Sequence, residues 1–210
     1  MSKKGLDESR RQFLAKVLPA GAVFCLGCKG LKASPSFLGS PPGTGQKSKY
    51  LEDAGMTAEE VYKFAYGYFL PFLENMGKSL GREKLLDLIK KAGAEIYTQL
   101  TPVLAKDLPS RDPRSLAKLI SDFMMGTPIY RQAFTFEITE LTDNVYEATY
   151  SQCLPAMVFR EMNAADIGFA FECSPAHALA KAFNPKMRLM NPKSLMKGDS
   201  VCIERYVLEA

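Results

Sequence analysis

Residues 134–153 read FTFEITELTDNVYEATYSQC, and the hydrophobic period in this stretch is that of a strand rather than that of a helix. Large apolar residues alternate with polar ones from Phe134 to Ile138, which indicates a half-buried β-strand. Thr142-Asp143-Asn144 is typical of a turn, and Val145 to Cys153 has the pattern of a second strand. The stretch therefore predicts an antiparallel hairpin.

Helical periodicity dominates the sequence around this hairpin. Thr57 and Glu60 form a capping box at the start of the first expected helix, and Pro113 follows the N-cap residue Asp112 at the start of the third. The expected helices span about residues 58–77, 83–102, 113–125, 156–173 and 175–183, with Ser174 as the N-cap of the last, and a final hairpin joins 193–196 to 200–208. These elements predict an α+β domain in which helices pack on one antiparallel sheet.

The first two expected helices each carry an apolar face that we expect to lie in the core. The face of the first is Val61, Phe64, Ala65, Tyr68, Phe69 and Phe72, and the face of the second is Leu85, Leu86, Ile89, Ala92, Ile96 and Leu100. Both sets recur at the three- and four-residue intervals of an amphipathic helix. An aromatic set of this kind is more often part of a core than of a cofactor site.

The first 28 residues are typical of an export signal. Arg10 and Arg11 precede an apolar run from Val17 to Gly27, and this run is shorter than the about 20 residues of a membrane-spanning helix. Paired arginines before such a run predict the twin-arginine export machinery as a partner and the periplasm or cell envelope as the location. Leu26-Gly27-Cys28 resembles a lipoprotein box, in which Cys28 would be lipidated. Cleavage near Leu31-Lys32-Ala33 is the alternative.

Residues 29–49 are rich in Gly, Ser, Pro and Lys and have no apolar period, which predicts a flexible linker before a domain at residues 50–210. The net charge of the chain is +4, with much of the excess in the signal and the linker. Because there is no basic stripe with interleaved aromatic residues, we expect no nucleic-acid partner. We expect membrane attachment only through the signal or a lipid anchor.

Three cysteines and the single histidine are the strongest candidates for chemistry. Cys153, Cys173 and Cys202 lie in the C-terminal half, and His177 follows Cys173 by four residues. Three interpretations remain open. Cys173 or Cys202 is a nucleophile with His177 as its base, or the three thiolates and the imidazole bind zinc, or the cysteines are packing residues or a structural disulfide. The three cysteines and His177 are not spaced as the close ligand pairs of a zinc ribbon, so the zinc alternative is the weakest. We expect no cofactor.

Several charged residues also have two interpretations each. Asp199 lies in a tight turn and is either only a turn residue or a further candidate for chemistry. Asp166 and Glu172 lie on an expected helix and are either solvated charges or acid–base partners. Arg160 and Arg131 could each bind a carboxylate, because arginine makes bidentate contacts with such groups.

Three segments of the C-terminal half form a pattern: Tyr150-Ser151-Gln152-Cys153, Phe171-Glu172-Cys173, and Leu195 to Cys202, which reads LMKGDSVC. This pattern resembles the L-2-amino-thiazoline-4-carboxylic acid hydrolase family, and the resemblance covers about residues 57–208 in its order of elements. The Gly-Asp-x-x-Cys ending is also similar to that of four-vinyl-reductase-type domains, which bind small molecules. The resemblance thus implies a ligand-binding α+β fold.

The family resemblance implies hydrolysis of a C–N or C–S bond in a small cyclic amidine, with N-carbamoyl-L-cysteine as the product of the family reaction. By position, we expect Cys173, His177, Asp199 and Cys202 to be catalytic, and Cys153 and Arg160 to bind substrate, around one pocket. The alternative is a non-catalytic small-molecule-binding or sensor module on the same fold, in which the thiols are buried and inert.

Overall fold

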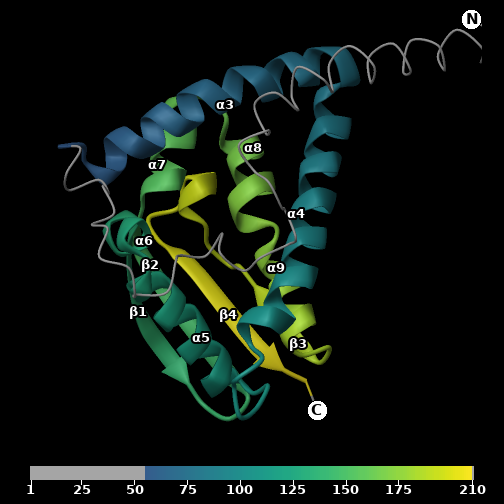
Figure 1. The fold of residues 1–210 in the computed structure, drawn as a ribbon, viewed down its shortest axis with the longest axis vertical. Helices are drawn as coiled ribbons and strands as arrows, with labels where there is room; N and C mark the ends of the chain where they lie inside the picture. Colours follow the sequence, from purple (N-terminus) through teal and green to yellow (C-terminus); the bar gives the residue numbers. More distant parts are fainter. Residues whose placement is uncertain (1–54, 210) are drawn as a thin grey trace, which may run out of the picture. The chain divides into compact units, whose positions relative to one another are not determined.

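The computed structural model describes residues 55–209, so the predicted signal, Cys28 and the predicted linker lie outside the described residues. The elements are α3 (Ala58–Leu80), α4 (Arg82–Leu104), α5 (Pro113–Gly126), α6 (Pro128–Ala133), β1 (Phe134–Leu141), β2 (Val145–Cys153), α7 (Leu154–Glu161), α8 (Ala165–Gly168), η2 (Phe169–Cys173), α9 (Ala176–Phe183), β3 (Met187–Met190), η3 (Leu195–Lys197) and β4 (Cys202–Leu208). Figure 1 shows helices packed on one sheet, which confirms the predicted α+β class. Within residues 55–209 no helix has the length and apolar character to cross a bilayer.

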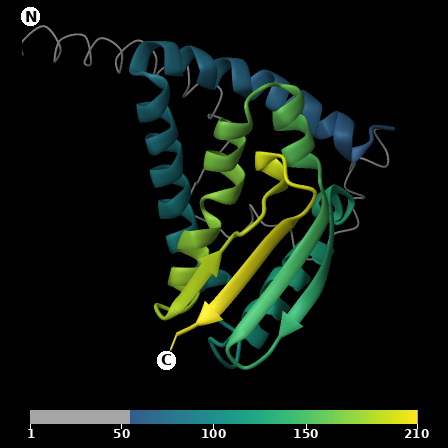
Figure 2. The ribbon, with the colours of Figure 1, turned by 180° about the vertical axis from the view of Figure 1, so that it is seen from behind.

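Four antiparallel strands form the sheet in the order β1-β2-β4-β3. β1 and β2 are the hairpin predicted over residues 134–153, and the Thr142 amide donates to the Val145 carbonyl at 2.8 Å in its turn. Figure 2, seen from behind, shows the strands with no helix in front of them, so the helices cover only one face of the sheet.

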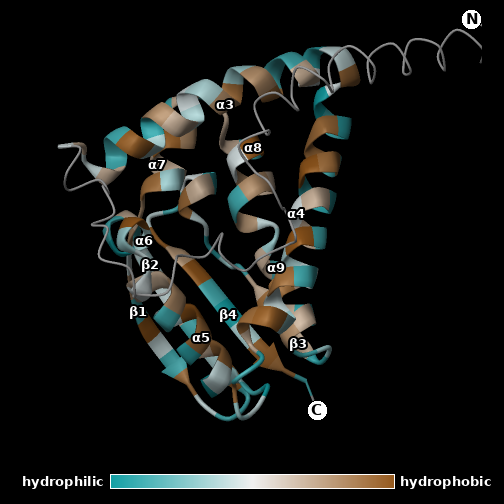
Figure 3. Ribbon diagram, viewed as in Figure 1, coloured by the Kyte–Doolittle hydropathy of each residue, from teal (hydrophilic) through white to brown (hydrophobic). Residues whose placement is uncertain are grey.

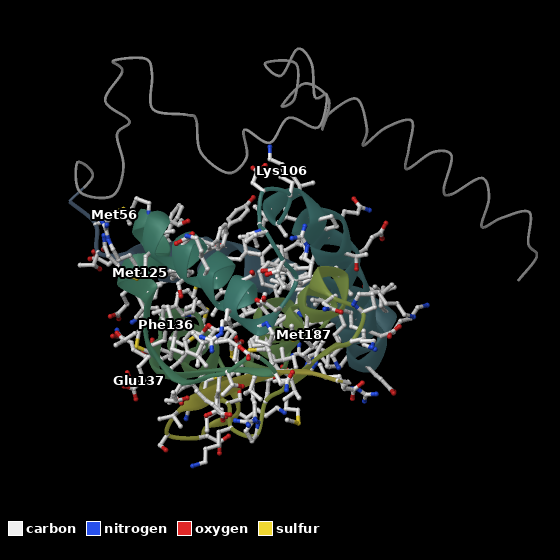
Figure 4. All side chains as sticks on the ribbon, turned by 90° about the horizontal axis from the view of Figure 1, so that it is seen from below. Met56, Lys106, Met125, Phe136, Glu137 and Met187 are labelled. Atoms are coloured by element: carbon white, nitrogen blue, oxygen red, sulfur yellow. The ribbon has the colours of Figure 1, made fainter. Side chains whose placement is uncertain are left out.

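Side chains of the strands alternate between this helix-covered face and the open face. Tyr146, Ala148 and Tyr150 of β2 are buried under the helices, whereas Glu147 lies on the open face and binds Arg205 of β4 at 2.8 Å. Figure 4 shows the same division on β1, where the labelled neighbours Phe136 and Glu137 lie on the helix side and the open side of the sheet.

Two hydrophobic clusters fill the space between the sheet and the helices. The first joins α3 to α7 and α8 and includes Tyr66 and Phe159. The second joins the sheet to α5 and α9 and includes Tyr206 and Phe183. Phe134 packs against both clusters, so the two clusters meet beside this residue. We call this boundary in the interior the seam.

The buried face of α3 differs from the predicted one. The capping box of Thr57 and Glu60 is present, but the buried residues are Ala58, Tyr62, Tyr66, Leu70, Leu73 and Gly77. Phe64, Tyr68 and Phe72, which were expected in the core, are 76%, 85% and 60% exposed. The prediction failed because both sides of this helix are apolar, and periodicity alone does not say which side meets the core.

The predicted face of α4 is confirmed in part, because Leu85 is buried and Leu86 and Ile89 pack against the first cluster, but its middle is shifted. Ala92 is exposed and Ile96 is 58% exposed, and Gly93 and Tyr97 take the inner positions. A Cβ atom on Gly93 would lie 2.6 Å from Cγ of Pro175, so glycine allows α4 to approach the start of α9. The helix continues past Pro102 to Leu104.

The expected final hairpin is wrong. β4 pairs with β3, and residues 195–197 form the 3-10 turn η3 instead of a strand. The cause is a tight loop, in which the Asp199 carboxylate accepts the Ser194 amide at 2.7 Å and Gly198 has a left-handed φ of 100°.

The helix expected over residues 156–173 is also divided. α7 ends at Glu161, Asn163 has a positive φ of 55°, and the chain then re-enters helix at α8. Ser174 is not an N-cap, because its backbone is already right-handed helical and the chain passes from η2 into α9 through it.

Candidate functional site

Glu172 lies on η2, a π-helical turn between α8 and α9. The Ser174 amide donates to the Phe169 carbonyl, five residues back, at 2.9 Å. Single π-helical turns occur frequently at functional sites. The Glu172 carboxyl points inward and accepts the hydroxyl of Tyr66 from α3. Burial raises the pKa of Glu172, and the Tyr66 hydrogen bond opposes this rise, so the carboxyl holds its proton at a higher pH than an exposed glutamate.

A second interior carboxyl belongs to Glu204 of β4. Tyr150 and Tyr206 donate their hydroxyls to its Oε2 atom at 3.4 and 3.1 Å. Burial raises the pKa of Glu204, and these hydrogen bonds lower it only in part. Ala148 lies directly opposite in the strand register, and its small side chain leaves room beside the carboxyl. The carboxyl therefore stands on the helix-covered face among three tyrosines, of which Tyr146 is the third.

The hydroxyl of Tyr146 is fully buried and has no hydrogen-bond partner among residues 55–209. Its pKa is raised first by burial and then by the charge of Glu204, which places the two groups near each other. Buried polar groups are nearly always hydrogen-bonded, so an unpaired hydroxyl indicates a position for water or for a polar group of a ligand.

The three thiols lie along the seam between the hydrophobic clusters. Cys153 and Cys173 pack against the first cluster and Cys202 against the second. Burial raises the pKa of Cys153 and of Cys202 to about 12, and it raises the pKa of Cys173 as well. The charges of Glu172 and Glu204 add to the rise at Cys153 and at Cys173. All three predicted thiols are therefore partly buried against the hydrophobic clusters.

This environment disfavours two of the chemistries considered for the thiols. A thiol with a raised pKa is scarcely ionised at neutral pH, and only the thiolate is a good nucleophile. Within residues 55–209 no set of three or more histidine, cysteine or acidic side chains is arranged to hold a metal ion. This part of the chain thus gives no support to the zinc alternative, with Cys153, Cys173, Cys202 and His177 as ligands. All three thiols are free.

His177 and Asp199 are exposed, although the charge of Asp199 adds to the rise of the Cys202 pKa. His177 is exposed on α9, and partial desolvation followed by the charge of Lys197 lowers the pKa of its imidazole. No hydrogen bond in the described part of the chain joins this ring to a thiol. Asp199 is exposed, and its carboxylate accepts the Ser194 amide, which is the turn role considered from the sequence.

A cavity of about 500 Å³ opens where β2 meets α7. Cys153 lines it, so the cavity reaches one of the three predicted thiols. Arg160 lines the same cavity, and its guanidinium donates to the Leu195 carbonyl at 3.4 Å. The volume is within the range of small-molecule sites.

Arg160 also lines a second hollow of about 460 Å³. Lys90 and Lys197 add two further cations to its wall, and Asp166 is bound by both nitrogens of Arg82 at 2.7 and 2.8 Å. Asp166 is therefore a surface ion-pair residue in this structure. The apolar lining residues are Leu86, Ala165, Phe169 and Met196. This second hollow combines uncompensated positive charge with apolar surface.

The sequence interpretation did not identify Glu204 or the tyrosines around both carboxyls. Glu204 could have been found, because the alternation of β4 places it on the same face as Cys202 and Tyr206. A carboxylate at an inward strand position is unusual enough to mark a site. Glu172 was considered as an acid–base partner, but nothing in the sequence separated it from Asp166.

Comparison with known proteins identifies a family but no characterised relative. Residues 61–206 match the sequence profile described as L-2-amino-thiazoline-4-carboxylic acid hydrolase. No curated protein matches the sequence.

Three solved structures with partial similarity are at most 16% identical to this chain. The phenol-responsive sensory domain of the transcription activator PoxR with phenol has a TM-score of 0.49 at 10% identity, over 73% of this chain and 75% of that one. A trafficking protein particle complex subunit 3 from Naegleria fowleri, covalently bound to palmitic acid, has a TM-score of 0.42 at 11% identity, over 72% of this chain and 95% of that one. An Fe(II) unliganded H-NOX protein mutant from K. algicida has a TM-score of 0.39 at 16% identity, over 69% of this chain and 74% of that one.

Proposed function

Because the chain belongs to the L-2-amino-thiazoline-4-carboxylic acid hydrolase family, we propose that it hydrolyses a small cyclic amidine that carries a carboxylate. In the reaction, water adds to the amidine carbon and the ring C–S bond breaks. The sulfur leaves as a thiol after it takes up a proton, and the open product is a carbamoyl amino acid. Water supplies all the added atoms, so no other reactant is needed.

The observation that carries this proposal is the interior carboxyl of Glu172 on η2, which accepts the Tyr66 hydroxyl. A reaction that moves a proton from water to a leaving sulfur needs a group whose pKa lies near the working pH. Burial moves Glu172 in this direction. We assign Glu172 as the general base toward water and the general acid toward sulfur, with Tyr66 positioning it.

Arg160 is our candidate for the substrate carboxylate. It lines the cavity that reaches Cys153, and none of the ion pairs among residues 55–209 involves it. Cys153 then contributes to the wall of the substrate site. Cys173 and Cys202 have no nucleophilic role in this proposal, because their raised pKa values oppose ionisation.

The test uses the purified full chain with 2-aminothiazoline-4-carboxylate, with the new thiol titrated by a chromogenic disulfide and the product identified by mass spectrometry. We expect Glu172→Gln to lower kcat by about 100-fold, the usual minimum for loss of a general acid–base group. Asp166→Asn is the matched control, since it removes a carboxylate of a surface ion pair. An active Glu172→Gln variant or an inactive Cys173→Ser variant would contradict the assignment, and no turnover by the wild type would reject the activity.

The second candidate function is a non-catalytic module that binds a small anionic molecule, and the second hollow favours it. Its three cations line it together with apolar residues, and none of them forms an ion pair within residues 55–209. Benzoate is a suitable probe, because it combines one negative charge with an apolar ring. Calorimetry should show binding that Lys90→Gln and Lys197→Gln each weaken several-fold and that Lys84→Gln, on the same helix, leaves unchanged. Binding without any turnover would favour this candidate over the hydrolase.

For the cellular location we keep the proposal made from the N-terminal sequence. The twin-arginine machinery would export the chain, and a lipid on Cys28 would retain it in the envelope. Replacing Arg10 and Arg11 with lysine should leave the protein in the cytoplasm, and Cys28→Ser should release it from the membrane fraction. An unchanged distribution in both variants would reject this location.

A further inference from the structure

The outward face of α3 carries an aromatic stripe, defined as Phe64, Tyr68, Phe72 and Met76. Successive members are four residues apart, so they form one line along the helix. The three aromatic side chains are 76%, 85% and 60% exposed, and Met76 is 36% exposed. Residues Phe64 to Leu73 include no charged side chain. A helix that is apolar on all sides is normally covered on all sides.

The opposite side of α3 is already used. Tyr62, Tyr66 and Leu70 pack into the first hydrophobic cluster, so the stripe has no role in the fold of the domain. Figure 3 shows hydrophobic residues around α3, which runs along the outside of the described domain. At about 200 Å² per aromatic side chain, the three rings alone expose on the order of 400 Å². A stable protein interface buries about 800 Å² on each partner, so the stripe would form the centre of one.

The charges at the two ends of the stripe indicate which partner fits. Glu60 lies one turn before Phe64, and Lys78 lies just beyond Met76. Glu60 and Lys78 are about five full helical turns apart and therefore project in the same direction. A two-fold axis at Tyr68 exchanges the ends of the helix, which places Glu60 of each copy beside Lys78 of the other. Lys78 has no carboxylate partner among residues 55–209, and its amine contacts only Asn75 at 3.2 Å.

We propose that the chain forms a two-fold symmetric homodimer in which two α3 helices pack antiparallel through their aromatic stripes. Phe64 of one copy then meets Phe72 of the other, and the two Tyr68 rings meet at the axis. This interface is isologous, so it closes at two copies and leaves no open stripe for further assembly. It does not depend on the proposed catalytic function, because no residue of the stripe lines either cavity.

Sedimentation velocity of the full chain over a range of concentrations tests the proposal. We expect a dimer whose dissociation constant Tyr68→Glu raises by about 100-fold, since a buried charge at the interface centre is severely unfavourable. The matched control is Met125→Glu, which changes a methionine of 53% exposure on another helix, α5. A monomer at all concentrations, or a dimer that Tyr68→Glu leaves intact, would overturn the proposal.

A charge exchange tests the antiparallel register separately. Lys78→Glu should weaken the dimer several-fold, because it places two carboxylates together at each end. The double variant Glu60→Lys with Lys78→Glu should restore it, and circular dichroism checks that the capping change leaves α3 folded. Failure of this restoration would reject the two-fold arrangement. Monomers that co-sediment with phosphatidylglycerol vesicles, and lose this with Tyr68→Glu, would assign the stripe to a lipid surface instead.

Discussion

The carboxyl of Glu172 illustrates how one residue acquires its properties from the fold. On the sequence it is one of several acidic residues before Cys173, and the π-helical turn places it against Tyr66 in the interior. Its neighbour in the sequence, Phe171, is 40% exposed. The pKa of Glu172 rises because of this burial, and the same change makes a carboxyl useful for moving protons near neutral pH.

The thiols give a direct prediction at the level of single residues. Cys153 and Cys202 have pKa values raised to about 12 by burial, so alkylation by iodoacetamide at pH 7.5 should be slow. Because the thiolate fraction grows about tenfold for each pH unit below the pKa, the rate at each site should rise without a plateau up to pH 10. Peptide mapping of the alkylated full chain measures each site separately. A plateau near pH 8 at any of these cysteines would show an activated thiol and would return it to the list of nucleophiles.

The sequence singled out Cys153, Cys173 and Cys202, but not the burial of these thiols against two hydrophobic clusters. Their expected meeting around one pocket stays a prediction. The expected pairing of His177 with a thiol is not found in the structure, because the continuous helical path from η2 into α9 leaves the imidazole exposed. Such an outcome depends on the direction of side chains around a helix, which sequence spacing alone does not give where the helical repeat changes.

Elements with strong local determinants were predicted well. The capping box at Thr57 and the Asp112 N-cap start their helices as expected, and β2 has the predicted bounds. The elements that were missed depend on tertiary contacts. β3 has only four residues, and its partner is β4, which follows after the η3 turn. The loop at Gly198 and Asp199 was recognised as a turn, but the segment before it was assigned to a strand.

One short helix gives a prediction about packing. Gly168 ends α8, and a Cβ atom there would lie 2.6 Å from Cγ of Phe159 and 2.7 Å from Sδ of Met196. Alanine normally favours a helix over glycine by about 1 kcal/mol. Here we expect Gly168→Ala to lower the free energy of unfolding by about 1–3 kcal/mol, because overpacking forces these neighbours apart. Urea unfolding followed by circular dichroism measures this change.

The control for this prediction is Gly126→Ala. Gly126 ends α5, and a Cβ atom there would meet no atom within 4 Å. This substitution should leave the free energy of unfolding within about 0.5 kcal/mol of the wild type. If the free energy of unfolding of Gly168→Ala equalled that of Gly126→Ala, the result would contradict the close packing of α8 against α7 and η3. Because Gly168 lies just before η2, the same variant should also disturb the position of Glu172.

The molecule as a whole places two carboxyls inside a domain that has hydrophobic clusters on both sides of them. Glu172 is bonded to Tyr66 of the first cluster, and Glu204 is bonded to Tyr150 and Tyr206 of the second. Burying these groups without full compensation costs folding free energy. Functional sites commonly concentrate such costs, and here the cost depends on pH because both carboxyls titrate.

The pH dependence of stability follows from the raised pKa of Glu204. Below about pH 4.3, the pKa of glutamate in an unfolded chain, this residue is protonated in both states and its contribution to stability is fully present. As the pH rises above that value, the unfolded chain loses the proton first, so stability falls until the folded carboxyl also ionises. The slope is at most about 1.4 kcal/mol per pH unit for one proton.

Glu204→Gln should remove this pH-dependent contribution. The free energy of unfolding of the variant, measured by urea at fixed protein concentration, should therefore rise relative to that of the wild type between pH 4.5 and pH 8. Glu137→Gln on the open face is the control and should follow the wild-type curve (Figure 4). Parallel curves for Glu204→Gln and the wild type would mean that Glu204 is not buried as a neutral acid, and the interior site would have to be redrawn without it.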